Sequence, residues 1–127
     1  MLYEFQDMLF DDELLGPNVL EHTLKKAESW LYVLAKKLGV QESDVIRSFV
    51  ADELVTLYCY RETCMNKAAS LIGQYSRNGS DDDYYSKKLK YINDRIAVLE
   101  AQITAEQLTG QPTKYAGYRN IPLYRGG

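Results

Sequence analysis

Residues that commonly carry chemistry are scarce in this chain of 127 residues, which has one histidine and two cysteines. Cys59 and Cys64 are spaced so that a helix places them about 140° apart around its axis, where they cannot form a disulfide with each other. Their spacing also differs from the C-x-x-C of zinc and redox sites, and His22 has no second metal ligand in a binding spacing. We therefore expect buried free thiols, no metal ion and no cofactor.

Long hydrophobic runs and catalytic signatures are missing as well. No apolar run approaches the roughly 18 residues that a membrane helix needs, and the first residues lack the pattern of a signal peptide. G-x-S-x-G and the glycine-rich phosphate-binding loops are absent, and the acidic run Asp81–Asp83 is typical of a helix start. These absences predict a soluble, unexported protein that is not an enzyme and has no membrane partner or small-molecule substrate.

The composition is that of an ordinary globular domain with a slight acidic excess. Hydrophobic residues make up 46% and charged residues 26%, and the formal net charge is −3 with a pI near 5.2. Such a length and composition suit one domain with a sizeable core. Direct nucleic-acid binding is not expected, because phosphate recognition needs a concentrated positive field.

Apolar periodicity predicts an all-α fold, a small helical bundle with a long central helix. The spacing predicts helices over 18–38, 44–75 and 81–108, after an acidic amphipathic N-terminal arm over 1–15 that is either a weak helix or an ordered segment. These form one helical domain over 1–110. The central helix is apolar nearly all round, so it must be covered on several sides by its own domain or by another subunit. Within its stripe, Glu53 and Arg61 are interpreted as flanking residues, with an internal charged site as the alternative.

The last long helix carries two apolar lines, which implies two partners. The main line has heptad-like spacing and comprises Tyr85, Leu89, Ile92, Ile96, Leu99 and Ile103. The second line, Tyr84, Tyr91 and Val98, lies about 100–140° around the axis from it. Thr104 and Gln107 then match a capping box for one final turn.

The sequence of residues 111–127 predicts an extended, strand-like tail. Its charged side chains are all basic, whereas residues 4–13 carry five acidic ones. A single strand in a helical protein must pair with another chain or stay solvated, and a disordered end is the alternative. Tyrosine suits partly wet interfaces, and three of the eleven lie here. The candidate interaction residues are therefore Tyr84, Tyr91, Val98, Tyr118, Arg119, Ile121, Leu123, Tyr124 and Arg125.

The order of these features resembles the small helical head–tail connector, or head-completion, proteins of tailed bacteriophages and prophages. The matching pieces, within residues 18–110, are Ala27–Leu31, Leu38–Val40, Val45–Tyr60, Asp83–Tyr91 and Ile103–Gly110. The resemblance implies a non-enzymatic virion component, assembled in the bacterial cytoplasm, that forms a homo-oligomeric ring at the head–tail junction. It also implies that extended termini contact neighbouring portal, neck or tail proteins.

A helix-turn-helix DNA-binding regulator using residues 31–50 is the alternative. Ala35, Gly39 and Val45 have the spacing that such motifs favour. The following helix, however, presents a mostly acidic set that would repel phosphates, including Glu42 and Asp44. This reading therefore ranks second.

Overall fold

The fold is built from helices and short helical turns. A computed structural model describes the backbone of residues 2–74 and 79–110, and the side chains of residues 2–67 and 85–110. Four α-helices follow one another as α1 (Glu21–Lys37), α2 (Phe49–Gln74), α3 (Gly79–Gln102) and α4 (Ala105–Thr109). Single 3-10 turns lie at Phe5–Asp7, Gly16–Asn18 and Glu42–Asp44. The predicted all-α class is confirmed, and the predicted tail over 111–127 lies outside the described residues.

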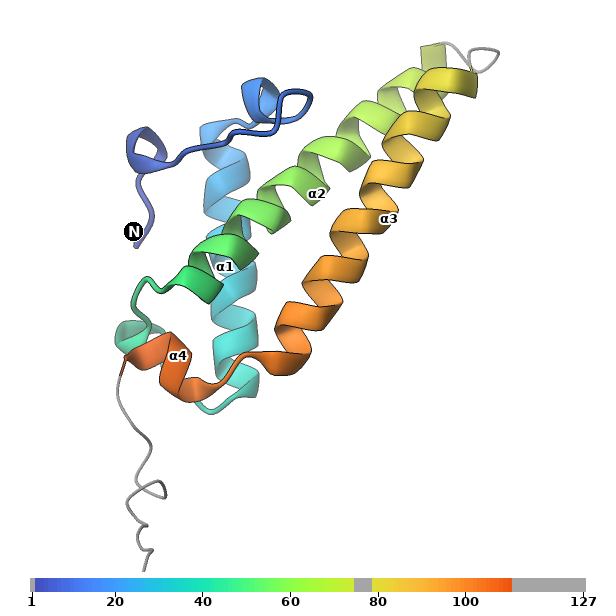
Figure 1. Cartoon of the computed structure of the whole chain (residues 1–127). Helices are drawn as coiled ribbons and strands as arrows, with labels where there is room; N and C mark the ends of the chain where they lie inside the picture. Colours follow the sequence, from blue (N-terminus) through green and yellow to red (C-terminus); the bar gives the residue numbers. More distant parts are fainter. Residues whose placement is uncertain (1, 75–78, 111–127) are drawn as a thin grey trace, which may run out of the picture.

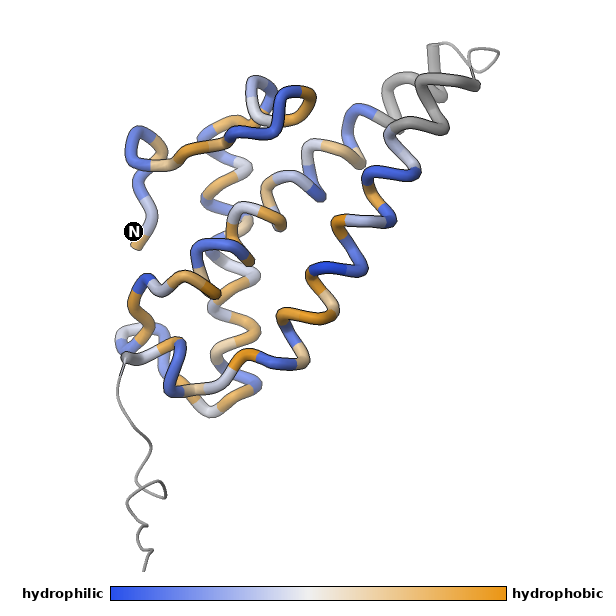
Figure 2. Tube along the Cα trace, in the orientation of Figure 1, coloured by the Kyte–Doolittle hydropathy of each residue, from blue (hydrophilic) through white to orange (hydrophobic). Residues whose placement is uncertain are grey.

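The long helix α2 is the centre of the bundle. It packs against α1 on one side and against α3 on another (Figure 1). The helices α2 and α3 run side by side and extend beyond α1, while the short α4 lies near the start of α2 (Figure 1). Hydrophobic and hydrophilic residues are interspersed along the coloured parts of the helices, as Figure 2 shows. The buried hydrophobic residues of α1, α2 and α3 belong to one core cluster.

The middle of α2 is buried all the way round, as its apolar circumference predicts. Four consecutive residues, 57–60, are buried, although they point in different directions around the helix. The cover comes from the chain itself, through α1, α3 and the N-terminal arm. The buried core residues of the other helices include Leu24, Ala27 and Leu31 of α1 and Ile92, Ile96 and Leu99 of α3.

The N-terminal arm is an ordered segment and not an amphipathic helix. It has a single 3-10 turn, and it reaches the core through Tyr3 and Leu15, both fully buried. Its bends are fixed locally, because one carboxylate oxygen of Asp12 accepts the backbone N–H groups of Leu14 and Leu15 at 2.9 and 2.8 Å. The arm therefore covers part of α1 and α2 as a strap.

Helices α1 and α2 both begin later in the chain than the sequence predicted. α1 begins at Glu21 and not at residue 18, because Asn18 belongs to the preceding 3-10 turn and its side chain donates to the Leu14 carbonyl. α2 begins at Phe49 and not at residue 44. The cap is Ser48, whose hydroxyl accepts the N–H of Ala51 at 3.2 Å, whereas the Ser43 region forms a separate 3-10 turn.

The predicted helix over 81–108 is two helices. α3 ends at Gln102, and Thr104 begins α4 with the expected capping box: its hydroxyl accepts from the Gln107 N–H at 3.2 Å, and its own N–H donates to the Gln107 side chain at 2.9 Å. Gly110 ends α4 with a φ of 70°, a left-handed conformation that favours glycine. The capping-box prediction is confirmed.

Candidate interaction surfaces

The second apolar line of α3 faces outward. Tyr91 is 68% exposed and Val98 43% exposed, whereas the main line is buried at Ile92, Ile96 and Leu99. Tyr91 and Val98 are two helical turns apart and share a face. The backbone of Tyr84 is helical, but its side chain lies outside the described residues. We call Tyr91 and Val98 the outer α3 line.

A second exposed apolar surface lies at the start of α2. Phe49 is 96% exposed and Ile46 is 45% exposed, and we call this pair the Ile46–Phe49 patch. The preceding Val45 is 6% exposed and turns into the core, so the extended backbone directs its neighbour Ile46 outward. Phe49 was not predicted to be a surface residue, because the apolar periodicity placed it inside a helix that begins at residue 44.

The N-terminal arm is held to α1 by the carboxylate of Glu28, which is only 4% exposed. Its two oxygens accept the backbone N–H groups of Leu2 at 3.0 Å and Tyr3 at 2.8 Å. The hydroxyl of Tyr32 donates to the same carboxylate at 2.6 Å. With three donors the carboxylate is engaged on both oxygens, so Glu28 holds the arm and is not free to act as a general base.

Tyr3 occupies the site between the arm and α2. Its hydroxyl donates to Asp52 at 2.7 Å, and the guanidinium of Arg47 lies 4.8 Å from the centre of its ring. Arg47 and Asp52 form an ion pair at 3.1 Å. Burial, together with the hydrogen bond to Asp52, raises the pKa of the Tyr3 phenol well above its ordinary value.

The other end of the arm is tied to α2 and α3. The backbone N–H of Asp12 donates to the hydroxyl of Tyr60 at 3.1 Å, and its side chain pairs with Lys88 at 2.8 Å. The ring of Phe10 packs edge-on against Tyr60, with centroids 6.1 Å apart. Desolvation acts to raise the pKa of the Asp12 carboxyl, but the Lys88 and backbone hydrogen bonds outweigh it, so the pKa lies below its ordinary value.

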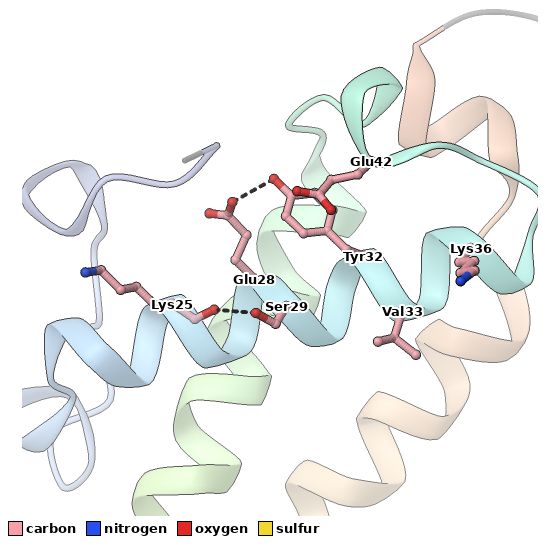
Figure 3. Close-up of a pocket in the computed structure, with 7 residues that line it drawn as sticks. All are labelled: Lys25, Glu28, Ser29, Tyr32, Val33, Lys36 and Glu42. Carbon is pink, nitrogen blue, oxygen red and sulfur yellow. Dashed lines mark hydrogen bonds between the residues drawn. The ribbon is translucent and has the colours of Figure 1, made fainter.

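An open groove of about 540 Å³ runs along the outer side of α1 (Figure 3). Its polar contacts are internal: Tyr32 donates to Glu28, and the Ser29 hydroxyl donates to the Lys25 carbonyl at 3.1 Å. Burial and the Glu28 hydrogen bond raise the pKa of the Tyr32 phenol above its ordinary value. The groove is lined by Lys25, Glu28, Ser29, Tyr32, Val33, Lys36 and Glu42.

The charged residues of α2 lie at its flanks, which fits their interpretation as flanking residues. Glu53 pairs with Arg95 of α3 at 2.9 Å, with both side chains two-fifths exposed. The guanidinium of Arg61 lies over the rings of Trp30 and Tyr58, 5.0 and 5.1 Å from their centres. These contacts fasten α1 and α3 to α2.

The two cysteines are free and buried, as predicted. Burial raises the pKa of the Cys59 thiol to about 12, and it also raises the pKa of Cys64. The Cys64 thiol donates to the carbonyl of Tyr85 at 3.1 Å. Both thiols are therefore weak nucleophiles, since the thiolate is the reactive form.

The segment proposed for a helix-turn-helix motif has a different geometry. Residues 38–48 separate α1 from α2, whereas such motifs join their helices by a turn of about three or four residues. The first turns of α2 are anchored in the core by Ala51, Leu54 and Val55, all fully buried. These three residues share one face of the helix, so that face of the start of α2 belongs to the core.

Of the nine interaction residues predicted from sequence, Tyr91 and Val98 have described side chains, and both are exposed. The six tail residues, Tyr118, Arg119, Ile121, Leu123, Tyr124 and Arg125, lie outside the described part of the chain. Among the residues whose side chains are described, 2–67 and 85–110, no three His, Cys, Asp or Glu side chains are grouped so that they could hold a metal ion. None of the described helices combines the length and apolarity needed to cross a membrane.

No protein-family model, curated protein or solved structure matches the chain.

Proposed function

We propose that this protein is a non-enzymatic assembly component of a phage or prophage particle that forms or joins a ring at the head–tail junction. The outer α3 line carries the proposal, because its apolar side chains are presented on a helix whose other face is already buried in the core. The assignment to a phage particle, and to its head–tail junction, rests on the sequence resemblance to head–tail connector proteins. The partners are further copies of the chain and the adjoining portal, neck or tail proteins.

The outer α3 line is suited to protein contact. Tyr91 joins a large apolar ring to a polar hydroxyl, a combination enriched at interfaces that are partly wet. Full burial of a side chain such as Val98 contributes about 1.5–3 kcal/mol. A ring requires a head-to-tail arrangement, in which this line of one copy meets a different surface of the next copy.

In this proposal, opposite charges on neighbouring copies set how the copies are oriented relative to each other. The arm exposes acidic side chains at Glu4, Asp7, Asp11 and Glu13, and residues 111–127 carry only basic charged residues. An arm of one copy and the tail of the next are therefore complementary in sign. Each exposed ion pair contributes only about 0–1 kcal/mol, so apolar contacts carry the affinity and charge sets the orientation.

Sedimentation velocity over rising protein concentration tests the self-association. We expect the wild-type chain to form larger species and the double variant Tyr91→Ser/Val98→Ser to remain monomeric with an unchanged thermal melt. Asn93→Ser is the matched control, because Asn93 is exposed on the same helix but outside the outer line. Equal self-association in both variants would contradict the role of this line.

The genes beside the coding sequence test the assignment to a particle. Portal, capsid or tail genes next to it are the expected result. A position beside a divergent promoter, together with a salt-sensitive shift of duplex DNA by the purified chain, would instead support a DNA-binding regulator and overturn the proposal.

A further inference from the structure

The exposure of the Ile46–Phe49 patch is imposed by the fold. The hydroxyl of Ser48 fixes the start of α2 by accepting the Ala51 N–H, and Val45 and Ala51 are buried on either side of the patch. With both flanks anchored, Phe49 cannot turn inward without unwinding the first turn of α2. A phenylalanine that is 96% exposed is therefore fixed on the surface.

The chain leaves α4 directly beside this patch. The backbone N–H of Ile46 donates to the carbonyl of Leu108 at 2.7 Å. A Cβ atom on Gly110 would lie 2.5 Å from the Cδ1 atom of Ile46, so the backbone at the end of α4 touches this side chain. Gly110, the last described residue, therefore lies at the edge of the patch.

The chemistry of residues 111–127 complements the patch and its surroundings. The segment carries aromatic and branched residues, three basic side chains and no acidic one. Glu42 and Asp44, just before the patch, are exposed carboxylates. The nearest cation in the sequence, Arg47, is paired with Asp52 at 3.1 Å. An apolar pair flanked by acidic groups thus lies beside Gly110, the residue after which the basic, tyrosine-rich sequence begins.

From this juxtaposition we propose that the Ile46–Phe49 patch is the docking site of the chain's own residues 111–127, with Tyr115 and Tyr118 against Phe49. Tyr115 is five residues beyond Gly110 and reaches up to about 16 Å from it, while Phe49 is three residues from Ile46, at most about 10 Å away. A tether of this length gives an effective concentration in the millimolar range, which favours the chain's own segment over that of a second copy. The contact is made within one chain through Tyr115 and Tyr118, leaves Arg119 and Arg125 for the arm of a neighbouring copy, and does not rest on the proposed function.

Fluorescence quenching of the full-length chain tests the contact. In a Trp30→Phe background, Phe49→Trp places the sole indole at the patch, and acrylamide quenching reports its exposure. If the tail occupies the patch for half of the time or more, quenching is at least about twofold weaker than in the same chain carrying Tyr115→Ser/Tyr118→Ser. Leu9→Trp in the same background is the control, because Leu9 is 80% exposed on the arm. Quenching of this tryptophan is expected to be the same with and without Tyr115→Ser/Tyr118→Ser.

A disulfide test guards against misfolding of the Trp30→Phe background. Oxidation of the Phe49→Cys/Tyr118→Cys chain, with Trp30 intact, is expected to give an intrachain disulfide faster than oxidation of Leu9→Cys/Tyr118→Cys. Equal quenching with and without the tyrosines, or equal disulfide rates, would overturn the proposal. Protection that rises with protein concentration would overturn it too, since the segment would then come from a second copy. Protection in a chain that never self-associates would support the docking site while contradicting self-association through the outer α3 line.

Discussion

The backbone N–H of Tyr3 donates to a carboxylate oxygen of Glu28 at 2.8 Å, in surroundings that leave Glu28 only 4% exposed. A buried carboxylate is costly unless its charge is compensated, and none of the three described groups that donate to it is a cation. Its compensation comes from two backbone N–H groups of the arm and one phenol. The arm and the buried charge thus stabilise each other, and removing either leaves the other without its partners.

Glu28→Gln is expected to release the start of the arm. Glutamine keeps one side-chain oxygen as an acceptor, but its amide nitrogen only donates, so one of the N–H groups of Leu2 and Tyr3 loses its acceptor. We predict a loss of about 2–3 kcal/mol in the free energy of unfolding, the range for hydrogen bonds to a charged group. Urea unfolding measures this loss, and Glu21→Gln, exposed on the same helix, is the control.

Hydrogen exchange separates release of the arm from general destabilisation. In Glu28→Gln, exchange at the Tyr3 amide is expected to accelerate more than exchange at Leu15, which is held by Asp12 at the other end of the arm. A uniform acceleration across the chain would contradict a local role for Glu28.

Tyr3→Phe isolates the hydroxyl that reaches α2. The variant keeps the ring beneath Arg47 but removes the 2.7 Å hydrogen bond to Asp52. Because Asp52 keeps its ion pair with Arg47, the expected loss is only about 1 kcal/mol, measured by urea unfolding. Tyr3→Ala also empties a fully buried ring site and is expected to cost about 3–5 kcal/mol. If Tyr91→Phe, at an exposed tyrosine, were as damaging as Tyr3→Phe, the assignment would be wrong.

Stability is expected to fall steeply in alkali. Burial and hydrogen bonds to carboxylates raise the pKa values of Tyr3 and Tyr58 above the ordinary 10.0. Above pH 10 the unfolded chain loses these phenolic protons while the folded chain retains them, so the stabilisation is full below pH 10 and declines as the pH rises. Each buried phenol contributes a slope of up to about 1.4 kcal/mol per pH unit.

Urea titrations between pH 8 and pH 11 measure this dependence. The slope above pH 10 is expected to be smaller in Tyr3→Phe and in Tyr58→Phe, each of which removes one titrating phenol. Tyr91→Phe is the control, because Tyr91 is largely exposed. An identical slope in all three variants would exclude the buried phenols as its source.

Local signals in the sequence predicted much of the fold. Leu24, Ala27 and Leu31, at the centre of the apolar stripe predicted for the first long helix, are fully buried, and Leu34 and Leu38 are partly buried, whereas its first member, Leu20, precedes α1 and is 54% exposed. The capping box of Thr104 and Gln107 involves residues three apart, so its contacts follow from the sequence spacing alone. The all-round apolar character of α2 likewise predicted that several elements would cover it.

Features that depend on distant residues were missed. Ser43 and Ser48 are both suitable caps, and the choice between them depends on the hydrogen bond from Ile46 to Leu108, which holds this stretch extended. The exposure of Phe49 follows from that later helix start. Glu28 has the appearance of an ordinary surface residue in the pattern of α1, because its donors lie on an arm whose path no periodicity reveals.

Thr63 on α2 is a place where stability can be gained. Its hydroxyl oxygen is buried and has no hydrogen-bond partner among the described residues. Replacement by valine keeps the shape and removes the unsatisfied group, so Thr63→Val is expected to raise the free energy of unfolding by about 1 kcal/mol. Thr63→Ser retains the hydroxyl but loses a buried methyl group, and is expected to lower it by about 1 kcal/mol. Thermal and urea unfolding of the pair measure both effects. A loss of stability in Thr63→Val would mean that the hydroxyl is held by a hydrogen bond that outweighs its burial.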